Sequence, residues 1–254
     1  MQPDINELRA FYNSPLGMAA QRSIDGVLSA LLADASGLEI AGLGYCGPFL
    51  DRLGSQAKRS IALMPAAQGG AAWPESGANR AVVVVDEQLP LSDGCLDRVI
   101  AVHALEHAES PLEVLRECWR VLVPGGKLLL VTPNRRGLWA RAERTPFGTG
   151  QPFSRSQLAD LLQQAMLSPV LWRNALAFPP VRRRSLVGLV SRADRLVQRV
   201  ARAFGGVIVV EAEKRLYQGL PAAARQQRRV FVPVFMPSPS PRDSNSHHRR
   251  TLFL

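Results

Sequence analysis

Hydrophobic residues in the middle of this chain change their spacing twice, which predicts a strand, a helix and a second strand. The apolar run Val99–Val102 is uninterrupted, as in a strand that is buried on both faces. Apolar residues then recur at helical spacing, at Leu112, Leu115, Trp119 and Leu122. Pro124-Gly125-Gly126 is a helix-ending signal, and a second apolar run, Leu128–Val131, follows it.

The same alternation extends along most of the chain. Helices are predicted over residues 5–34, 49–53, 154–166 and 182–204. Further strands are predicted over residues 38–43, 60–63, 81–85, 170–178 and 207–213. Residues 65–79 and 135–152 are rich in Gly, Pro or Arg and are expected to be loops. Strands that alternate with helices indicate a parallel, doubly wound α/β sheet.

The segment from Asp97 to Asn134 resembles class I S-adenosylmethionine-dependent methyltransferases with a methyltransferase type 11-like domain. The matching residues are Leu105-Glu106-His107, Pro111, Leu115, Glu117, Arg120-Val121-Leu122, Pro124-Gly125-Gly126 and Pro133-Asn134. The resemblance implies a Rossmann-like, doubly wound, mostly parallel sheet whose antiparallel last strand would be residues 207–213. It also implies that S-adenosyl-L-methionine is the cofactor.

The resemblance gives an expected domain organisation. Residues 1–35 would form helices over the cofactor cleft, and residues 36–235 would form the methyltransferase domain. Residues 236–254 are rich in Pro, Ser and basic side chains, which predicts a disordered basic tail.

Three glycines lie between the first strand and the next helix, in a variant of the family's glycine motif. Gly42, Gly44 and Gly47 would let the backbone approach a ligand closely. This G-x-G-x-x-G spacing suits a dinucleotide or S-adenosylmethionine, and it also suits a tight turn that binds no ligand. The family usually has an acidic residue two positions before the first glycine, where this chain has Ile40.

The second strand departs further from the family pattern. Its end reads Leu63-Met64-Pro65, where related enzymes have an acid that binds the ribose hydroxyls. Losing such a charge-assisted hydrogen bond weakens binding by about 1.5–3 kcal/mol, on the order of ten- to a hundredfold. Met64 would instead pack on the adenine. Asp86 or Glu87, after the third strand, is expected to face the adenine, and the alternative is a solvated acidic loop.

Polar residues follow the two central strands, where open α/β sheets bind their ligands. His103 is the candidate catalytic base, because imidazole titrates near neutral pH. The alternative is a histidine that is packed at the entrance of a helix. Asn134, Arg135 and Trp139 are expected to border the acceptor pocket, and their chemistry suits an acidic or amphiphilic acceptor.

Composition limits the setting of the protein. None of the 254 residues belongs to an apolar run long enough to cross a membrane, and no signal-peptide pattern opens the chain. The three cysteines lack a zinc-binding spacing, so a reducing cytoplasm and no metal site are expected. Residues 1–134 carry 10 Lys and Arg against 15 Asp and Glu, whereas residues 135–254 carry 21 against 6.

The leading prediction is therefore an S-adenosylmethionine-dependent methyltransferase for a small-molecule or lipid-like acceptor. The alternative is a non-catalytic relative with weak or lost cofactor binding, whose basic C-terminal half binds a partner. An NAD-dependent oxidoreductase has only the glycine turn in its favour. Nucleic acid is not favoured as a partner, because no aromatic residues are interleaved with the basic ones. Peripheral contact with an anionic membrane stays open, and no sequence feature defines an oligomeric state.

Overall fold

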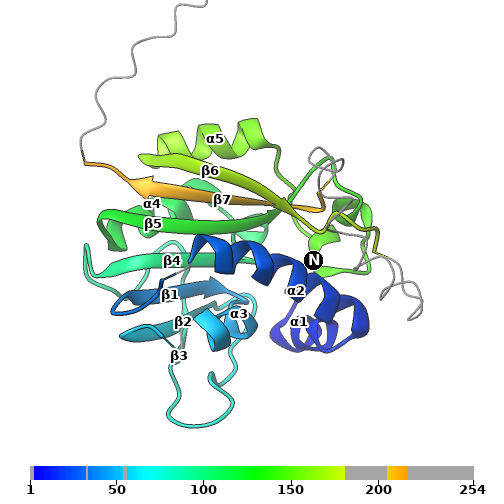
Figure 1. Ribbon diagram of the computed structural model, residues 1–254, viewed down its shortest axis with the longest axis horizontal. Coiled ribbons are helices and arrows are strands. Elements are labelled where there is room, and N and C mark those ends of the chain that lie inside the picture. The colour runs from blue at the N-terminus through cyan, green and yellow to red at the C-terminus, as the bar shows by residue number, and fades with distance from the viewer. Residues whose placement is uncertain (1–2, 33, 54–55, 181–204, 217–254) are drawn as a thin grey trace, which may run out of the picture. The chain divides into compact units, whose positions relative to one another are not determined.

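The computed structural model describes residues 3–32, 34–53, 56–180 and 205–216. Within these ranges, seven strands form one sheet in the order β3-β2-β1-β4-β5-β7-β6 (Figure 1). The strands are β1 (Glu39–Gly44), β2 (Arg59–Pro65), β3 (Ala81–Val84), β4 (Leu96–Val102), β5 (Leu122–Pro133), β6 (Leu167–Ala175) and β7 (Val207–Lys214). Strands β1 to β5 are parallel, and β7 pairs antiparallel with β5 and β6. The predicted α/β fold with an antiparallel last strand is confirmed.

Helices cover both faces of this sheet (Figure 1). They are α1 (Ile5–Tyr12), α2 (Pro15–Leu31), α3 (Gly47–Leu53), α4 (Pro111–Val121) and α5 (Arg155–Gln164). Side chains of α1, α2 and α3 pack with Ile40, Ile100 and Val102 on one face. Side chains of α4 and α5 pack with Val99 and Ala101 on the other. This arrangement follows from the alternation of side chains along a strand.

The helical region predicted over residues 5–34 forms two helices, α1 and α2. Asn13 ends α1, and the Ser14 hydroxyl accepts a hydrogen bond from the backbone N–H of Gly17 to cap α2. Pro15 occupies the first turn of α2, where its missing N–H costs nothing. The predicted helix over residues 182–204 and the tail from residue 236 lie outside the described residues.

The predicted apolar stripe of the central helix is partly wrong. Helix α4 buries Val114, Leu115, Cys118 and Val121. Leu112 and Trp119 are only partly buried, and Leu122 is already the first residue of β5. Pro124-Gly125-Gly126 therefore lies within β5 and does not end the helix.

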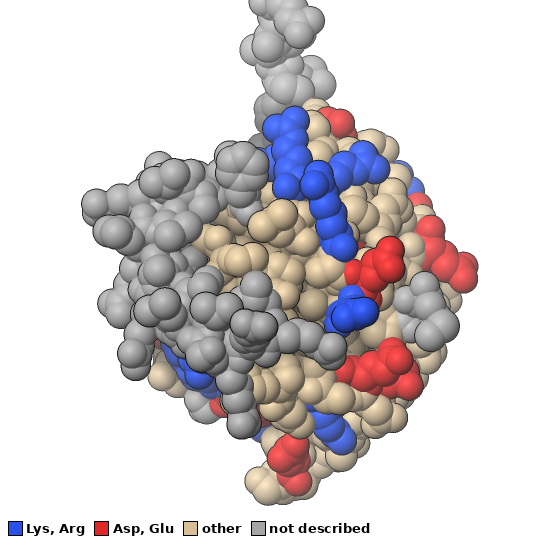
Figure 2. Space-filling view, turned by 90° about the vertical axis from the view of Figure 1, so that its right-hand side faces the viewer, with Lys and Arg blue, Asp and Glu red and all other residues tan. Residues whose placement is uncertain are grey.

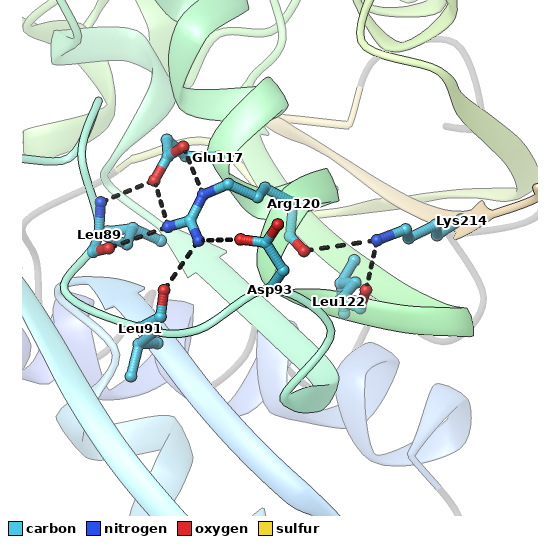
Figure 3. A network of polar contacts seen from close by, with 7 residues as sticks. All are labelled: Leu89, Leu91, Asp93, Glu117, Arg120, Leu122 and Lys214. Carbon is cyan, nitrogen blue, oxygen red and sulfur yellow. Dashed lines mark hydrogen bonds and ion pairs between the residues drawn. The ribbon is translucent and has the colours of Figure 1, made fainter.

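Arg120, near the end of α4, fastens the connection between β3 and β4 (Figure 3). Its guanidinium donates hydrogen bonds to the carboxylates of Glu117 and Asp93, with the shortest distances 2.8 and 2.6 Å. It also donates to the backbone carbonyls of Leu89 and Leu91. Hydrogen bonding from Arg120 holds the pKa of the Glu117 carboxyl below its usual value. One side chain thus satisfies several groups of a loop that has no regular structure.

Lys214 at the end of β7 reinforces the same corner of the molecule (Figure 3). Its ammonium donates to the carbonyl of Leu122 at 2.7 Å and lies 4.1 Å from the ring centroid of Trp119. The end of the antiparallel strand is thereby joined to the end of α4 and the first residue of β5.

We expect Arg120→Ala to lower the free energy of unfolding by about 1.5–3 kcal/mol, because it removes several hydrogen bonds to charged and backbone groups. Urea denaturation measures this change. Arg116→Ala is the matched control, because Arg116 makes an exposed ion pair with Glu113 on the same helix. That variant should change stability by less than about 0.5 kcal/mol. Equal losses in the two variants would contradict the assigned role of Arg120.

Candidate functional site

The carboxyl ends of β1 and β4 lie side by side, and this places two loops at one edge of the sheet. Gly44 pairs with Val102 in the parallel register. The backbone N–H of Tyr45 then donates to the carbonyl of Val102 at 2.9 Å. His103 and Tyr45 are therefore neighbours, although 58 positions separate them along the sequence.

His103 is fully buried at this edge and held from three sides. Its Nδ1 lies 3.1 Å from the Glu106 carboxylate, and its Nε2 lies 2.9 Å from the Tyr12 hydroxyl. The side-chain amide of Gln68 donates a hydrogen bond to the backbone carbonyl of His103. With an ionised Glu106, which can only accept, Nδ1 donates its proton and Nε2 accepts from Tyr12. His103 has a backbone φ of 53°, an unfavourable left-handed conformation of the kind that clusters at functional sites.

Aromatic rings attach α1 to this edge. The ring of Tyr12 stacks on Tyr45 with centroids 5.3 Å apart and meets Phe49 edge-on. Phe147 lies 4.6 Å from the imidazole of His103, again between centroids. Burial raises the pKa of the Tyr12 phenol well above its usual value. Tyr12 therefore stays protonated at neutral pH.

A cavity of about 270 Å³ lies beside this cluster. Gly47 and Met64, two of the predicted cofactor residues, are on its walls. Aromatic rings of Tyr12, Tyr45 and Trp73 also line it. The polar residues on its walls are Arg9, Asn13, Gln21, Asp51 and Glu75. The cavity thus combines flat apolar faces with charges of both signs.

The other two predicted glycines face protein atoms. A Cβ on Gly42 would lie 2.5 Å from the Cβ of Cys46, on the side of α3. Gly44 has a φ of +84°, and a Cβ there would overlap with the carbonyl oxygen of Val102. Both glycines allow close packing of β1 against its neighbours, and neither lines a described cavity.

Asp86 and Glu87 are half-buried after β3 and line none of the described cavities. The Glu87 carboxylate accepts a hydrogen bond from the backbone N–H of Ser110 at 2.9 Å, at the start of α4. Burial raises the pKa of the Asp86 carboxyl. The structure thus gives Glu87 a capping role that the sequence pattern does not indicate.

A larger groove, of about 1000 Å³, lies on the other side of α1. Phe11, Leu16 and Pro146 supply apolar walls. The charged residues along it are Arg141, Arg144, Glu7 and Glu143. Figure 2 looks at the molecule from the side of α1, where basic and acidic side chains border part of an uncharged surface.

The three predicted acceptor residues are not on the walls of this groove. Trp139 is fully buried and donates from its indole N–H to the carbonyl of Phe178 at 2.6 Å. The amide of Asn134 is also buried and donates to the carbonyl of Gly205. Arg135 is exposed. Trp139 packs edge-on against Phe147, so it supports the wall between the groove and His103.

The cavity beside Tyr45 suits S-adenosylmethionine, the cofactor expected from the resemblance. Arg9 could pair with the carboxylate of its methionine part, and Asp51 and Glu75 could accept from its ammonium or hydroxyl groups. Tyr45, Met64 and Trp73 offer faces for the adenine. The volume is just below the usual range of about 300–1,000 Å³ for small-molecule sites. Among the described residues, no cluster could hold a metal ion, and no described helix could cross a membrane.

We expect Tyr12→Phe to lower the free energy of unfolding by about 1–3 kcal/mol, because it leaves a buried imidazole nitrogen without its partner. Tyr45→Phe is the matched control, because it keeps the stacked ring and removes a hydroxyl with no hydrogen-bond partner among the described residues. Chemical denaturation of both variants measures the difference. An unchanged Tyr12→Phe protein would show that the contact with His103 contributes nothing to stability.

Comparison with known proteins agrees with this architecture. Residues 25–130 match the profile of a methyltransferase domain family. A probable S-adenosylmethionine-dependent methyltransferase of Mycolicibacterium smegmatis is 35% identical over 80 residues, 31% of this chain and 31% of that protein. A ubiquinone biosynthesis O-methyltransferase of Xanthomonas oryzae pv. oryzae is 48% identical over 42 residues, 16% of this chain and 18% of that protein. The matches thus span less than a third of either relative.

Solved structures share the fold over a longer stretch. A crystal structure of an S-adenosylmethionine-dependent methyltransferase from Thermotoga maritima, a possible histamine N-methyltransferase, superposes with a TM-score of 0.58. It is 18% identical in sequence, and the match covers 83% of this chain and 96% of that one. Residues 25–130 are thus similar to a methyltransferase domain, and most of the chain shares its fold with a solved S-adenosylmethionine-dependent methyltransferase.

Proposed function

We propose that this protein transfers the methyl group of S-adenosylmethionine to a small anionic or amphiphilic acceptor. The observation that carries the proposal is the pair of hollows on either side of α1. Tyr12 lines the smaller cavity, with Gly47 and Met64, and the adjacent residue Phe11 lines the larger groove. The methyl donor would occupy the first and the acceptor the second.

The residues that line the groove indicate which chemical class of acceptor it would bind. Its apolar residues suit a hydrocarbon or aromatic body, and Arg141 and Arg144 suit an anionic group. Glu7 and Glu143 keep the charge of the groove mixed. This combination supports an amphiphile with one anionic group over a polyanion such as nucleic acid.

Methyl transfer from a sulfonium is a displacement in which the cofactor carries the activated group, so the protein mainly holds the reactants and excludes water. Where the acceptor must lose a proton, the Tyr12 oxygen would take it while the Tyr12 proton moves to Nε2 of His103. Glu106 would then stabilise the imidazolium. His103 is buried with both ring nitrogens paired, so we propose that it acts through Tyr12.

A non-catalytic role is the second candidate. It is favoured by the end of β2, where Leu63-Met64-Pro65 offers no carboxylate, and by the packing of Gly42 and Gly44 against protein atoms. The two candidates differ in a single measurable property, which is the binding of the cofactor.

We expect S-adenosylmethionine and S-adenosylhomocysteine to bind with micromolar dissociation constants, about −8 kcal/mol. Isothermal titration calorimetry measures this directly. NAD serves as the control and should give no heat, because the glycine turn alone is insufficient to bind it. Absence of heat with millimolar S-adenosylhomocysteine would rule out the enzymatic proposal and favour the non-catalytic one.

We expect radiolabelled methyl groups to pass to long-chain carboxylic acids or phenols more readily than to amines or RNA. Replacing Arg141 and Arg144 together with Gln should reduce transfer to anionic acceptors about three- to tenfold, as for two exposed charge contacts. Arg116→Gln, on the helix layer of the opposite face, is the matched control. Equal transfer by the double variant would exclude the groove as the acceptor site.

A further inference from the structure

The cavity beside Tyr45 lacks an acid from the strand that usually supplies one. Strand β2 ends in Leu63-Met64-Pro65, and Met64 contributes a thioether to the cavity wall. The Met64 sulfur accepts a hydrogen bond from the backbone N–H of Ala71 at 3.3 Å. Ribose hydroxyls would therefore meet no carboxylate of β2.

Helix α3 brings a carboxylate to the same cavity from another direction. Asp51 follows Gly47 by four residues, so the two lie on one face of the helix. Both line the cavity, together with Met64. The end of β2 and the Asp51 side chain thus share one hollow.

Asp51 is also held in a defined orientation. The indole N–H of Trp73 donates to Oδ1 of Asp51 at 2.8 Å. Trp73 is only 5% exposed, so the donor is fixed by its surroundings. None of the described residues donates a hydrogen bond to Oδ2 of Asp51. This oxygen is therefore available to a ligand.

We propose that Asp51 is the carboxylate that accepts hydrogen bonds from the ribose hydroxyls of the cofactor. The inference rests on the proposed function, because it requires that S-adenosylmethionine occupies this cavity. The ribose-binding acid would then come from α3, oriented by Trp73, in place of an acid at the end of β2.

Glu75 is the competing carboxylate on the same cavity. It lies in the exposed loop between β2 and β3 and makes no hydrogen bond with the described residues. Ordering such a side chain on binding costs conformational entropy, whereas Asp51 is already oriented. The geometry therefore favours Asp51.

The test compares ligands with and without ribose hydroxyls on variants that keep the fold. Calorimetry would be run with S-adenosylhomocysteine, adenosine and 2′,3′-dideoxyadenosine. Asp51→Asn retains an oxygen that can accept from the Trp73 indole while it removes the charge. Glu75→Gln tests the competing residue, and Asp160→Asn on the exposed side of α5 is the remote control.

We expect Asp51→Asn to weaken S-adenosylhomocysteine and adenosine about tenfold, as for loss of a charge-assisted hydrogen bond at a partly exposed site. Binding of dideoxyadenosine should stay within twofold of wild type, as should all binding to the remote control Asp160→Asn. Glu75→Gln should cause no loss that is selective for ligands with ribose hydroxyls.

Wild-type affinity in Asp51→Asn, or an equal loss for dideoxyadenosine, would overturn the assignment while leaving the proposed function intact. Failure of the wild-type protein to bind S-adenosylhomocysteine would instead overturn both the proposed function and the role given to Asp51. A selective loss in Glu75→Gln would transfer the role to that residue and refute the one given to Asp51.

Discussion

The buried chain of hydrogen bonds from Tyr12 through His103 to Glu106 determines how the whole site is arranged. It joins the first helix to the loop after the central strand, and all three side chains are nearly inaccessible to solvent. Buried polar groups are costly unless they are paired, so α1 cannot leave the edge of the sheet without exposing or orphaning the imidazole. The position of α1 in turn separates the small cavity from the large groove. This polar contact, together with the aromatic packing of Tyr12, therefore helps to define both hollows.

Local patterns in the sequence predict the sheet well because most of the described strands contain a short apolar run. The edge where ligands would bind is also predictable, because the carboxyl ends of parallel strands converge there. The partner of His103 could not be found this way. Tyr12 lies 91 positions earlier, and only tertiary packing brings the phenol to Nε2. The predicted apolar stripe of α4 was partly wrong because the exact end of a helix is harder to predict from sequence than the presence of the helix.

The glycine motif illustrates how one pattern can have two physical causes. A glycine between a strand and a helix permits a close approach, but the pattern does not say what approaches. At Gly42 and Gly44 the neighbour is the protein itself, and only Gly47 borders the cavity. Filling the space at Gly44 would therefore disturb the pairing of β1 with β4 before it affected a ligand. Substitution of Gly44 consequently reports on folding and cannot locate the cofactor.

Two features of this region are related: the end of β2 lacks a carboxylate, and the loop that follows it carries Trp73. No regular helix occurs in the described residues between β2 and β3, and this loop instead carries Trp73 against the start of α3. The indole of Trp73 lies against Gly47 and also donates a hydrogen bond to Asp51. Trp73 therefore both lines the cavity and orients the carboxylate of Asp51. A side chain at Gly47 would press on the ring, with its Cβ 3.2 Å from Trp73 Cδ1. Gly47 thus leaves room for Trp73, and Trp73 in turn orients Asp51, the residue that we propose in place of an acid on β2.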